Sequence, residues 1–429
     1  MEDSTRIAEI ENEIEAQALR AALDAEGIPH ILRSFYDAAY DGIFQLQKGW
    51  GAVYAPPEYE AQVLAALDSI RQEQPAPPTV PRLFNACLLR PQDLDPSSPE
   101  LAVAGVFNPG AIEHNGEVLL LARVAECAAE DRPGFTASPR LDLDTGQVII
   151  DWFDNREVRK IDPRLIEVKE SGAIRLTFLS HLRLFRSPDG KSFTPADVSF
   201  LPASETETYG VEDPRITKIG DTCYLTYVAV SPHGAATALA ATQDFQTFQR
   251  LGIIFPPENK DVVLFPEPID GEFVALHRPT PATPFGMPEM WLARSPDLLH
   301  WGKHEPVHTG ATGWESGRIG AGAPPIKLDS GWLEIYHGNQ KPPAGEGVGI
   351  YAAGALLLDL EHPGTIRKCS AEALFLPESD FECNGFVPDV LFPTAVIERE
   401  DTLLIYYGAA DENTGVIECA KEDLLAALD

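Results

Sequence analysis

Hydrophobic residues follow two different patterns along the chain. In the first part, apolar side chains at helical spacing, such as Ile14, Ala18 and Leu23, alternate with short apolar runs typical of strands. This pattern predicts strands over 5–10, 30–34 and 44–54, the last broken at Gly49 and Gly51, and helices over 11–26 and 57–71. The order of these elements predicts a small α+β ferredoxin-like domain over residues 1–72.

A proline-rich stretch follows this domain. Residues 73–81 contain Pro75, Pro77, Pro78 and Pro81, and such segments favour extended, semi-rigid conformations. The stretch is therefore predicted to be a linker, with a second domain over 82–429.

From residue 82 a turn residue followed by a strand-like run rich in Leu, Val, Ile and Tyr recurs five times. The copies begin at Gly116, Gly220, Gly271, Gly331 and Asp401. Repeats of roughly 50 residues built from short strands are typical of β-propellers. The sequence thus predicts a mainly β fold and a five-bladed β-propeller, with a two-sheet sandwich as the alternative. The 104 residues between the first two copies require an insertion or extra hairpins between 126 and 208.

Turn signals accompany three of these repeats. Ser or Thr and Asp recur at fixed offsets within 185–190, 241–245 and 293–298. These side chains accept and donate hydrogen bonds to their own backbone in tight turns. Hairpin turns between outer strands are therefore predicted at the three places.

Charge narrows the classes of partner. The 429 residues carry a formal net charge of -33, which repels phosphate backbones and anionic membranes, so neither nucleic acid nor a membrane is an expected partner. A neutral substrate is favoured, and an anionic one requires a locally basic pocket.

The six cysteines are scattered without CxxC pairs, so no metal site or disulfide framework is predicted. With no targeting segment or apolar run long enough to span a membrane, we expect a cytoplasmic protein and leave a homo-oligomer open.

Candidate acid chemistry centres on residues 209–216. Pro214 follows Glu212 and Asp213, which disfavours helical geometry at Asp213, and Arg215 supplies an opposite charge. A carboxylate between one like and one opposite charge can have a shifted pKa and serve as a catalytic acid. The alternative interpretation is an acidic turn with a solvated arginine.

Polar residues at matching places in the five repeats are expected to meet in the central channel of a propeller. The convergence of acids, amides and cations predicts a site that holds both a neutral polyol and an anion, whereas each residue alone fits a polar rim or a salt bridge between blades. The set consists of Asn108, Arg123, Asp213, Arg215, Lys260, His277, Arg278, His337 and Asp411.

Several motifs in this order resemble glycoside hydrolase family 130. They span nearly all of 82–429 and are Phe107-Asn108-Pro109-Gly110, Arg123-Val124, Gly210-Val211-Glu212-Asp213-Pro214-Arg215, Asn259-Lys260-Asp261, Leu276-His277-Arg278-Pro279, Gly320-Ala321-Gly322, Tyr336-His337-Gly338 and Tyr407-Gly408-Ala409-Ala410-Asp411. The resemblance implies a five-bladed propeller and an inverting phosphorylase of β-mannosides that releases α-mannose 1-phosphate. The segments at Asn12 and Gly27-Ile28-Pro29 resemble a prokaryotic signal-transducing protein domain, which implies little chemistry.

The resemblance also implies roles for single residues. It makes Asp213 the proton donor, acting through the 3-hydroxyl of the mannosyl ring, and places Asn108, Arg123 and Asp411 on the mannosyl unit. Arg215 and His337 are further substrate-binding candidates. Lys260, His277 and Arg278 match phosphate-binding positions, with inorganic phosphate as co-substrate and no other cofactor. For Lys260 the alternative is an ordinary ion pair with Asp261 or Glu258.

Two alternatives remain at this stage. A β-mannosidase on the same fold needs a carboxylate base to activate water, with Glu267, Glu315 or Asp389 as candidates. A non-catalytic glycan-sensing propeller is the second. Some members of the family carry a further arginine shortly after the position that matches Arg123. This chain has a different sequence there, in which Arg132 and Arg140 are the candidates to reach phosphate. The segment 231–234 also differs, and we expect it to shape the acceptor side.

Overall fold

The computed structural model describes residues 5–10, 13–34, 51–72, 80–281, 288–310, 313–340 and 348–429. The chain divides into two compact units, Met1–Pro77 and Pro78–Asp429. The division falls within the proline-rich stretch 73–81, of which 73–79 lie outside the described residues. Among the described helices, none has the length and apolar character needed to cross a membrane.

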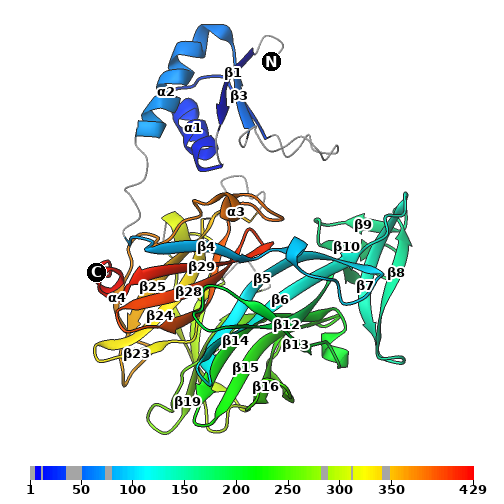
Figure 1. Cartoon of the computed structure of the whole chain (residues 1–429). Helices are drawn as coiled ribbons and strands as arrows, with labels where there is room; N and C mark the ends of the chain where they lie inside the picture. The colour runs from blue at the N-terminus through cyan, green and yellow to red at the C-terminus, as the bar shows by residue number, and fades with distance from the viewer. Residues whose placement is uncertain are drawn as a thin grey trace. The chain divides into compact units, whose positions relative to one another are not determined.

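The smaller unit is an α+β structure. Its elements are β1 (Thr5–Ile10), α1 (Glu13–Ala25), β2 (Ile31–Ser34), β3 (Gly51–Ala55) and α2 (Glu60–Gln72). The strands form an antiparallel sheet in the order β1-β3-β2, and Figure 1 shows both helices beside it. Leu19 and Leu23 of α1 and Val63 of α2 are fully buried in the core of this unit. The predicted helices and the strands at 5–10 and 30–34 are confirmed, whereas 35–50 lie outside the described residues.

The larger unit is built mainly from five groups of antiparallel strands. The first group contains β5 (Leu101–His114), β6 (Glu117–Ala128), β12 (Leu179–Ser187) and β13 (Thr194–Phe200), and the second contains β14 (Gly210–Ile219), β15 (Thr222–Ser231), β16 (Gly234–Thr242) and β17 (Gln249–Phe255). The third contains β18 (Asn259–Leu264), β19 (Phe273–Pro279), β20 (Met290–Ser295) and β21 (Gly302–His308), and the fourth contains β22 (Ile319–Ala321), β23 (Ile326–Leu328), β24 (Gly331–Asn339), β25 (Tyr351–Leu358) and β26 (Ile366–Cys369). The fifth contains β27 (Leu391–Glu398), β28 (Thr402–Ala409), β29 (Asn413–Ala420) and β4 (Phe84–Leu89). The five strands predicted from the repeat are confirmed as β6, β15, β19, β24 and β28.

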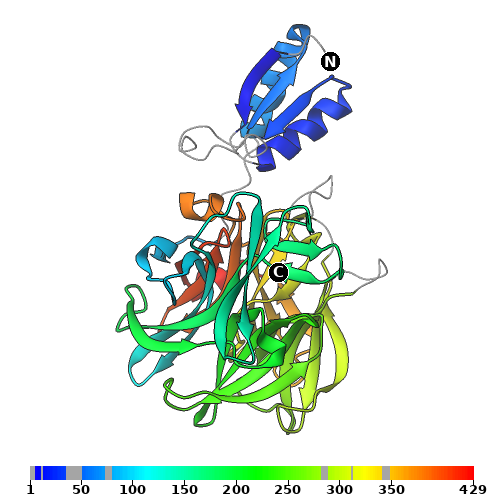
Figure 2. The ribbon, with the colours of Figure 1, turned by 90° about the vertical axis from the view of Figure 1, so that its right-hand side faces the viewer.

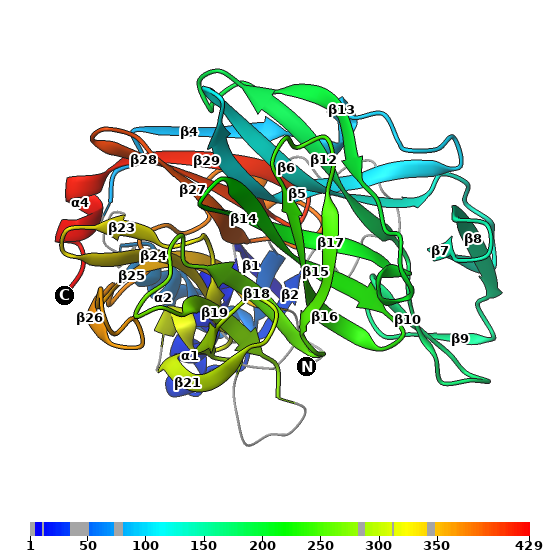
Figure 3. The ribbon, with the colours of Figure 1, turned by 90° about the horizontal axis from the view of Figure 1, so that it is seen from below.

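The groups follow one another around the larger unit. In Figure 3 the colour passes from cyan through green and yellow to red, so that the last group lies beside the first. Strand β4, which comes first in this unit, pairs with β29 near the C-terminus. The first and second groups are joined by one parallel bridge between Ser180 and Gly210. The first strand of the unit therefore completes its last group.

An insertion interrupts the first group between β6 and β12, as the sequence predicted. It contains β7 (Phe135–Asp142) paired with β8 (Gln147–Asp154), and a second sheet of β9 (Val158–Lys160), β10 (Leu165–Val168) and β11 (Ile174–Leu176). Figures 1 and 3 show the insertion on the opposite side of the larger unit from helix α4 (Lys421–Ala426), and Figure 2 views the unit from the side of the insertion.

The three predicted turns are confirmed. Ser187 Oγ accepts from the backbone of Gly190 at 2.8 Å, Thr242 Oγ1 accepts from Phe245 at 3.0 Å, and Asp297 Oδ1 accepts from Leu299 at 2.9 Å. Each turn joins the third and fourth strands of its group. The short polar side chains therefore replace backbone partners where the chain reverses.

Candidate active site

Three bulged strands carry the polar residues at the centre of the larger unit. The ladders of β5, β14 and β18 are interrupted at Asn108, Asp213 and Asp261, whose φ angles are 48°, 49° and 55°. Asn and Asp tolerate this left-handed region better than other residues with a side chain. A bulge inserts one residue and redirects its side chain. The same local device therefore recurs in three successive groups of strands.

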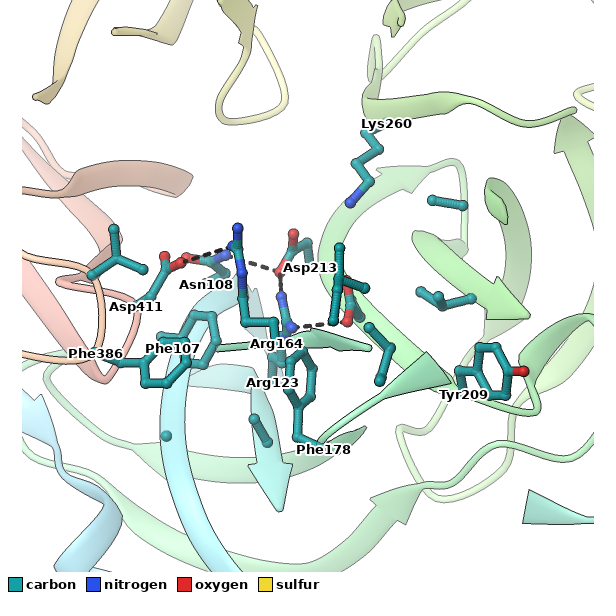
Figure 4. Close-up of a pocket in the computed structure, with 18 of the residues that line it drawn as sticks. Phe107, Asn108, Arg123, Arg164, Phe178, Tyr209, Asp213, Lys260, Phe386 and Asp411 are labelled. Carbon is teal, nitrogen blue, oxygen red and sulfur yellow. Dashed lines mark hydrogen bonds and ion pairs between the residues drawn. The ribbon is translucent and has the colours of Figure 1, made fainter. Parts of the chain in front are cut away.

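A cavity of about 660 Å³ lies where these strands meet. Figure 4 shows several of its lining residues, with Asp213 between Arg123 and Lys260. Six of the predicted site residues line the cavity, namely Asn108, Arg123, Asp213, Lys260, Arg278 and Asp411. Arg215, His277 and His337 are described but do not line it. The tertiary structure thus brings together most of the set and holds three members behind the wall.

Asp213 is a carboxylate held by two neighbours, with 11% of its side chain exposed. Its Oδ1 accepts from Asn108 Nδ2 at 2.9 Å and from Arg123 Nη1 at 3.0 Å. Burial raises the pKa of Asp213, but the charges of Arg123, Arg215 and Lys260 outweigh burial and hold the pKa below its ordinary value. Asp213 is therefore ionised at neutral pH.

Arg123 uses its whole guanidinium within the protein. Nη2 donates to Glu212 at 2.8 Å and Nε donates to Ser180 at 3.0 Å, in addition to the bond to Asp213. The guanidinium carbon lies 4.6 Å from the centre of the Phe107 ring, and Phe107 is its partner across the β5–β6 ladder. This fixed cation positions the carboxylates of the site.

Arg215 is the second buried arginine of the site and is only 1% exposed. Nε donates to the carbonyl oxygen of Gly322 at 2.5 Å, and Nη1 donates to the carbonyl oxygen of Asp213 at 2.8 Å. The interpretation of residues 209–216 as an acidic turn with a solvated arginine is therefore wrong. Residues 210–216 start strand β14, and the Arg215 side chain is buried.

Asp261 joins three cationic or ionisable side chains, and the sequence analysis gave it no role in the site. Its Oδ2 lies 2.8 Å from Arg278 Nε and 2.9 Å from His337 Nε2, and its Oδ1 lies 3.8 Å from Arg215 Nη2. Burial raises the pKa of Asp261, but the charge of Arg278 and the bond from His337 outweigh it, so the pKa lies far below its usual range. Asp261 is ionised.

Gly320 makes this cluster sterically feasible. A Cβ atom at position 320 would overlap Asp261 Oδ2 and His337 Nε2. The glycine in the Gly320-Ala321-Gly322 motif therefore allows the close approach of β22 to the ion pair.

Lys260 and Arg278 face the same cavity because they are directly opposite each other across the β18–β19 ladder. His277, the next residue along β19, faces the other way. It stacks on Phe255 at 4.6 Å and lies 3.0 Å from Asn259 Nδ2. Burial, with a smaller contribution from His304, lowers the pKa of His277 to about 3, so the imidazole is neutral.

Two cations of the cavity have no carboxylate within 4 Å in the described part of the chain, namely Lys260 and Arg318. Glu258 instead accepts from the backbone of Ala235 at 3.0 Å, so the alternative ion pair of Lys260 is not formed. Arg318 lines the cavity just before β22 and was missed from the sequence. Arg132 pairs with Glu130, and Arg140 pairs with Asp151, both outside the cavity lining.

The insertion contributes part of the wall of the cavity. Arg164, which directly precedes β10, places Nη1 3.9 Å from Asp411 Oδ2, and Phe178 follows β11. Burial raises the pKa of Asp411, although Arg123 and Arg164 act in the opposite direction. The part of the chain between the first two repeats therefore shapes the cavity.

The three candidate bases for hydrolysis lie outside the cavity lining of the described chain. Glu267 pairs with Lys327 at 2.5 Å, and Glu315 accepts from Tyr336 Oη at 2.9 Å. Asp389 directly precedes the lining residue Val390 but is not itself in the lining. Among the described residues, no group of three or more His, Cys, Asp or Glu side chains is arranged to hold a metal ion.

The fold and the cavity define a mainly β protein in which Asp213 and other carboxylates share a cavity with the unpaired cations Lys260 and Arg318. A family model described as beta-1,4-mannooligosaccharide phosphorylase (Glyco_hydro_130) matches residues 174–429. The beta-1,2-mannobiose phosphorylase of Listeria innocua serovar 6a is 40% identical over 348 residues, which are 80% of this chain and 96% of that protein. The chain belongs to glycoside hydrolase family 130.

Two further similarities agree with this assignment. The 1,2-beta-oligomannan phosphorylase of Thermoanaerobacter sp. (strain X514) is 35% identical over 252 residues, covering 58% of this chain and 81% of that one. A solved structure of the Listeria innocua beta-1,2-mannobiose phosphorylase with beta-1,2-mannobiose superposes with a TM-score of 0.74 at 39% identity, covering 79% of this chain and 96% of that chain.

Proposed function

We propose that the protein is an inverting, phosphate-dependent phosphorylase of β-mannosides that releases α-mannose 1-phosphate. The observation that carries this proposal is the pair Lys260 and Arg318, two cations in the cavity of Asp213 that lack a carboxylate partner among the described residues. Lys260 is partly buried and Arg318 is exposed, and unpaired cations beside a catalytic acid favour the binding of an oxyanion. The named relatives, all phosphorylases of β-linked mannosides, support the same reaction.

In the proposed reaction Asp213 is the proton donor, and Asn108 and Arg123 orient it. Phosphate bound by Lys260, Arg278 and Arg318 attacks the anomeric carbon from the face opposite the leaving group. An anionic nucleophile needs no general base, unlike the water of a hydrolase. The placement of Glu267, Glu315 and Asp389 outside the cavity lining gives no support to a β-mannosidase.

The remaining predicted residues receive different roles in this proposal. Asp411 binds the mannosyl unit beside Arg164. Arg215, His277 and His337 position other side chains from behind the cavity wall, since none of them lines the cavity. The acid and the cations together argue against a purely glycan-sensing protein.

We also propose that the five groups of strands are the blades of a five-bladed propeller. Their order around the unit and the pairing of β4 with β29 support this arrangement. The ferredoxin-like character of the smaller unit, its resemblance to a signal-transducing domain, a cytoplasmic location and a homo-oligomer stay predictions.

The test is incubation of the protein with β-1,2- and β-1,4-linked mannobiose, each with and without phosphate, followed by detection of mannose 1-phosphate. We expect sugar phosphate to form only when phosphate is present, and its formation to fall by about a hundredfold or more with Asp213→Asn. Release of free mannose at equal rates with and without phosphate would contradict phosphorolysis.

A further inference from the structure

The cation-lined part of the cavity contains a carboxylate that faces the expected anion. Asp261 lines the cavity beside Lys260 and Arg278, and it is only 4% exposed. Its Oδ2 is occupied by Arg278 Nε and His337 Nε2. Its Oδ1 makes no hydrogen bond to any described residue, because Arg215 Nη2 at 3.8 Å is too distant for one. Asp261 therefore retains acceptor capacity on one oxygen.

A carboxylate at this place repels any anion that can only accept hydrogen bonds. An anion that carries a proton meets a different environment, since its hydroxyl can donate to the free oxygen in a short charge-assisted bond. Hydrogenphosphate and sulfate have the same tetrahedral shape and the same charge of two. They differ in that phosphate keeps at least one proton at neutral pH and sulfate keeps none.

We propose that Asp261 selects protonated oxyanions, with Oδ1 accepting a hydrogen bond from the hydroxyl of hydrogenphosphate and thereby excluding sulfate. This inference rests on the proposed phosphorolytic function. Lys260, Arg278 and Arg318 then attract both anions, whereas Asp261 repels sulfate. Binding sites that discriminate strongly use both kinds of interaction.

The other carboxylates of the cavity are less suited to this role. Glu212 accepts from Arg123, Asp213 is reserved for proton donation, and Asp411 lies beside Arg164. Glu258 accepts from the backbone of Ala235. Asp261 adjoins Lys260 in the chain and is paired with Arg278, so it is the carboxylate most closely tied to the cations.

A purely positioning role for Asp261 makes a different prediction. If Asp261 served only to hold Arg278 and His337, the cations would bind sulfate about as well as phosphate. The two possibilities are therefore separated by comparing anions of one shape and charge, without altering the protein.

The experiment measures phosphorolysis of mannobiose by the full-length protein at varied phosphate, with sulfate and selenate as inhibitors and arsenate as a replacement for phosphate. We expect arsenate, which is protonated like phosphate, to act within about tenfold of phosphate. We expect the inhibition constants of sulfate and selenate to exceed the KM for phosphate at least thirtyfold. A smaller ratio overturns the role of Asp261 and leaves the phosphorylase intact. Turnover that does not depend on phosphate overturns both.

A variant provides the second measurement. Asp261→Asn keeps the shape of the side chain but places a donor or a neutral acceptor where Oδ1 lies. The ratio of the inhibition constant of sulfate to the KM for phosphate should therefore fall at least fivefold. Asp221→Asn, in the exposed turn between β14 and β15, should keep the ratio of the parent protein. An unchanged ratio in Asp261→Asn contradicts the proposal, and if that variant does not fold, the anion series on the parent protein decides.

Discussion

The guanidinium of Arg215 donates from Nη1 to the main-chain carbonyl oxygen of Asp213 at 2.8 Å, two residues away in the same strand. This bond spans the bulge that places Asp213 in the left-handed region. Since the same side chain also donates to the carbonyl oxygen of Gly322, which directly follows β22, it ties the acid to the fourth group of strands. The geometry of the acid thus depends on a residue that does not line the cavity.

The Arg215→Ala variant should lose stability. Removing one partner from a buried ionic cluster typically costs about 3 to 5 kcal/mol, because the remaining charges stay buried without compensation. Urea unfolding followed by fluorescence measures the change. Arg156→Ala, which removes an exposed ion pair with Asp154, is the control and should leave the midpoint unchanged. A midpoint for Arg215→Ala equal to that of the control would show that the cluster does not contribute to stability.

Asp213→Asn should reduce turnover by about a hundredfold to ten-thousandfold, the usual contribution of a positioned acid. The amide keeps the shape of the side chain and a partner for Asn108 and Arg123, but it cannot donate the required proton. Steady-state phosphorolysis, with circular dichroism to check folding, measures the effect. Activity within tenfold of the parent protein would remove Asp213 from the mechanism.

Lys260→Ala and Arg318→Ala should each raise the KM for phosphate more than the KM for the mannoside. A charge-assisted hydrogen bond to an anion is worth about 1.5 to 3 kcal/mol, which corresponds to about tenfold to over a hundredfold in phosphate affinity. Lys303→Ala, which removes a surface ion pair with Glu272, is the matched control. If the variants lost affinity only for the mannoside, phosphate would have to bind at a different place.

Phosphate should raise the pKa of Asp213. In the protein alone the cations, including Lys260, outweigh burial and hold this pKa below its ordinary value. Bound phosphate offsets the charge of Lys260, so the acid gains its proton more readily in the complex. Activity falls as pH rises through the pKa of an essential acid, and a raised pKa therefore moves the alkaline limb of the profile to higher pH. Profiles of kcat and of kcat/KM for phosphate test this, and superimposable alkaline limbs would contradict it.

Removal of residues 1–77 should leave an active protein, because these residues form a separate compact unit. Removal of residues 1–90 should abolish folding, since it deletes β4, which pairs with β29, and Arg82, whose Nη1 donates to the buried Glu382 at 2.7 Å. Solubility, thermal unfolding and phosphorolysis of the two truncated proteins measure the difference. An inactive 78–429 protein would show that the smaller unit takes part in the activity.

The sequence by itself determined the strands and the chemistry of the motifs. Strand-like apolar runs and turn residues are local properties, so the five repeated strands, the three side-chain turns and the insertion could be predicted. Side chains also alternate in direction along a strand, so the neighbours His277 and Arg278 face opposite sides of the sheet. Applied to that pair, the rule would have kept one of them out of the cavity.

Only the tertiary structure decided which polar residues meet. A bulge breaks the alternation by one residue, so counting along the strand could not tell whether Lys260 or Asp261 faces the cavity, and both line it. Arg164 and Arg318 lie outside regular repeats and reach the cavity through the path of the chain. Cavities form between segments distant in sequence, and their lining depends on packing that no local pattern encodes.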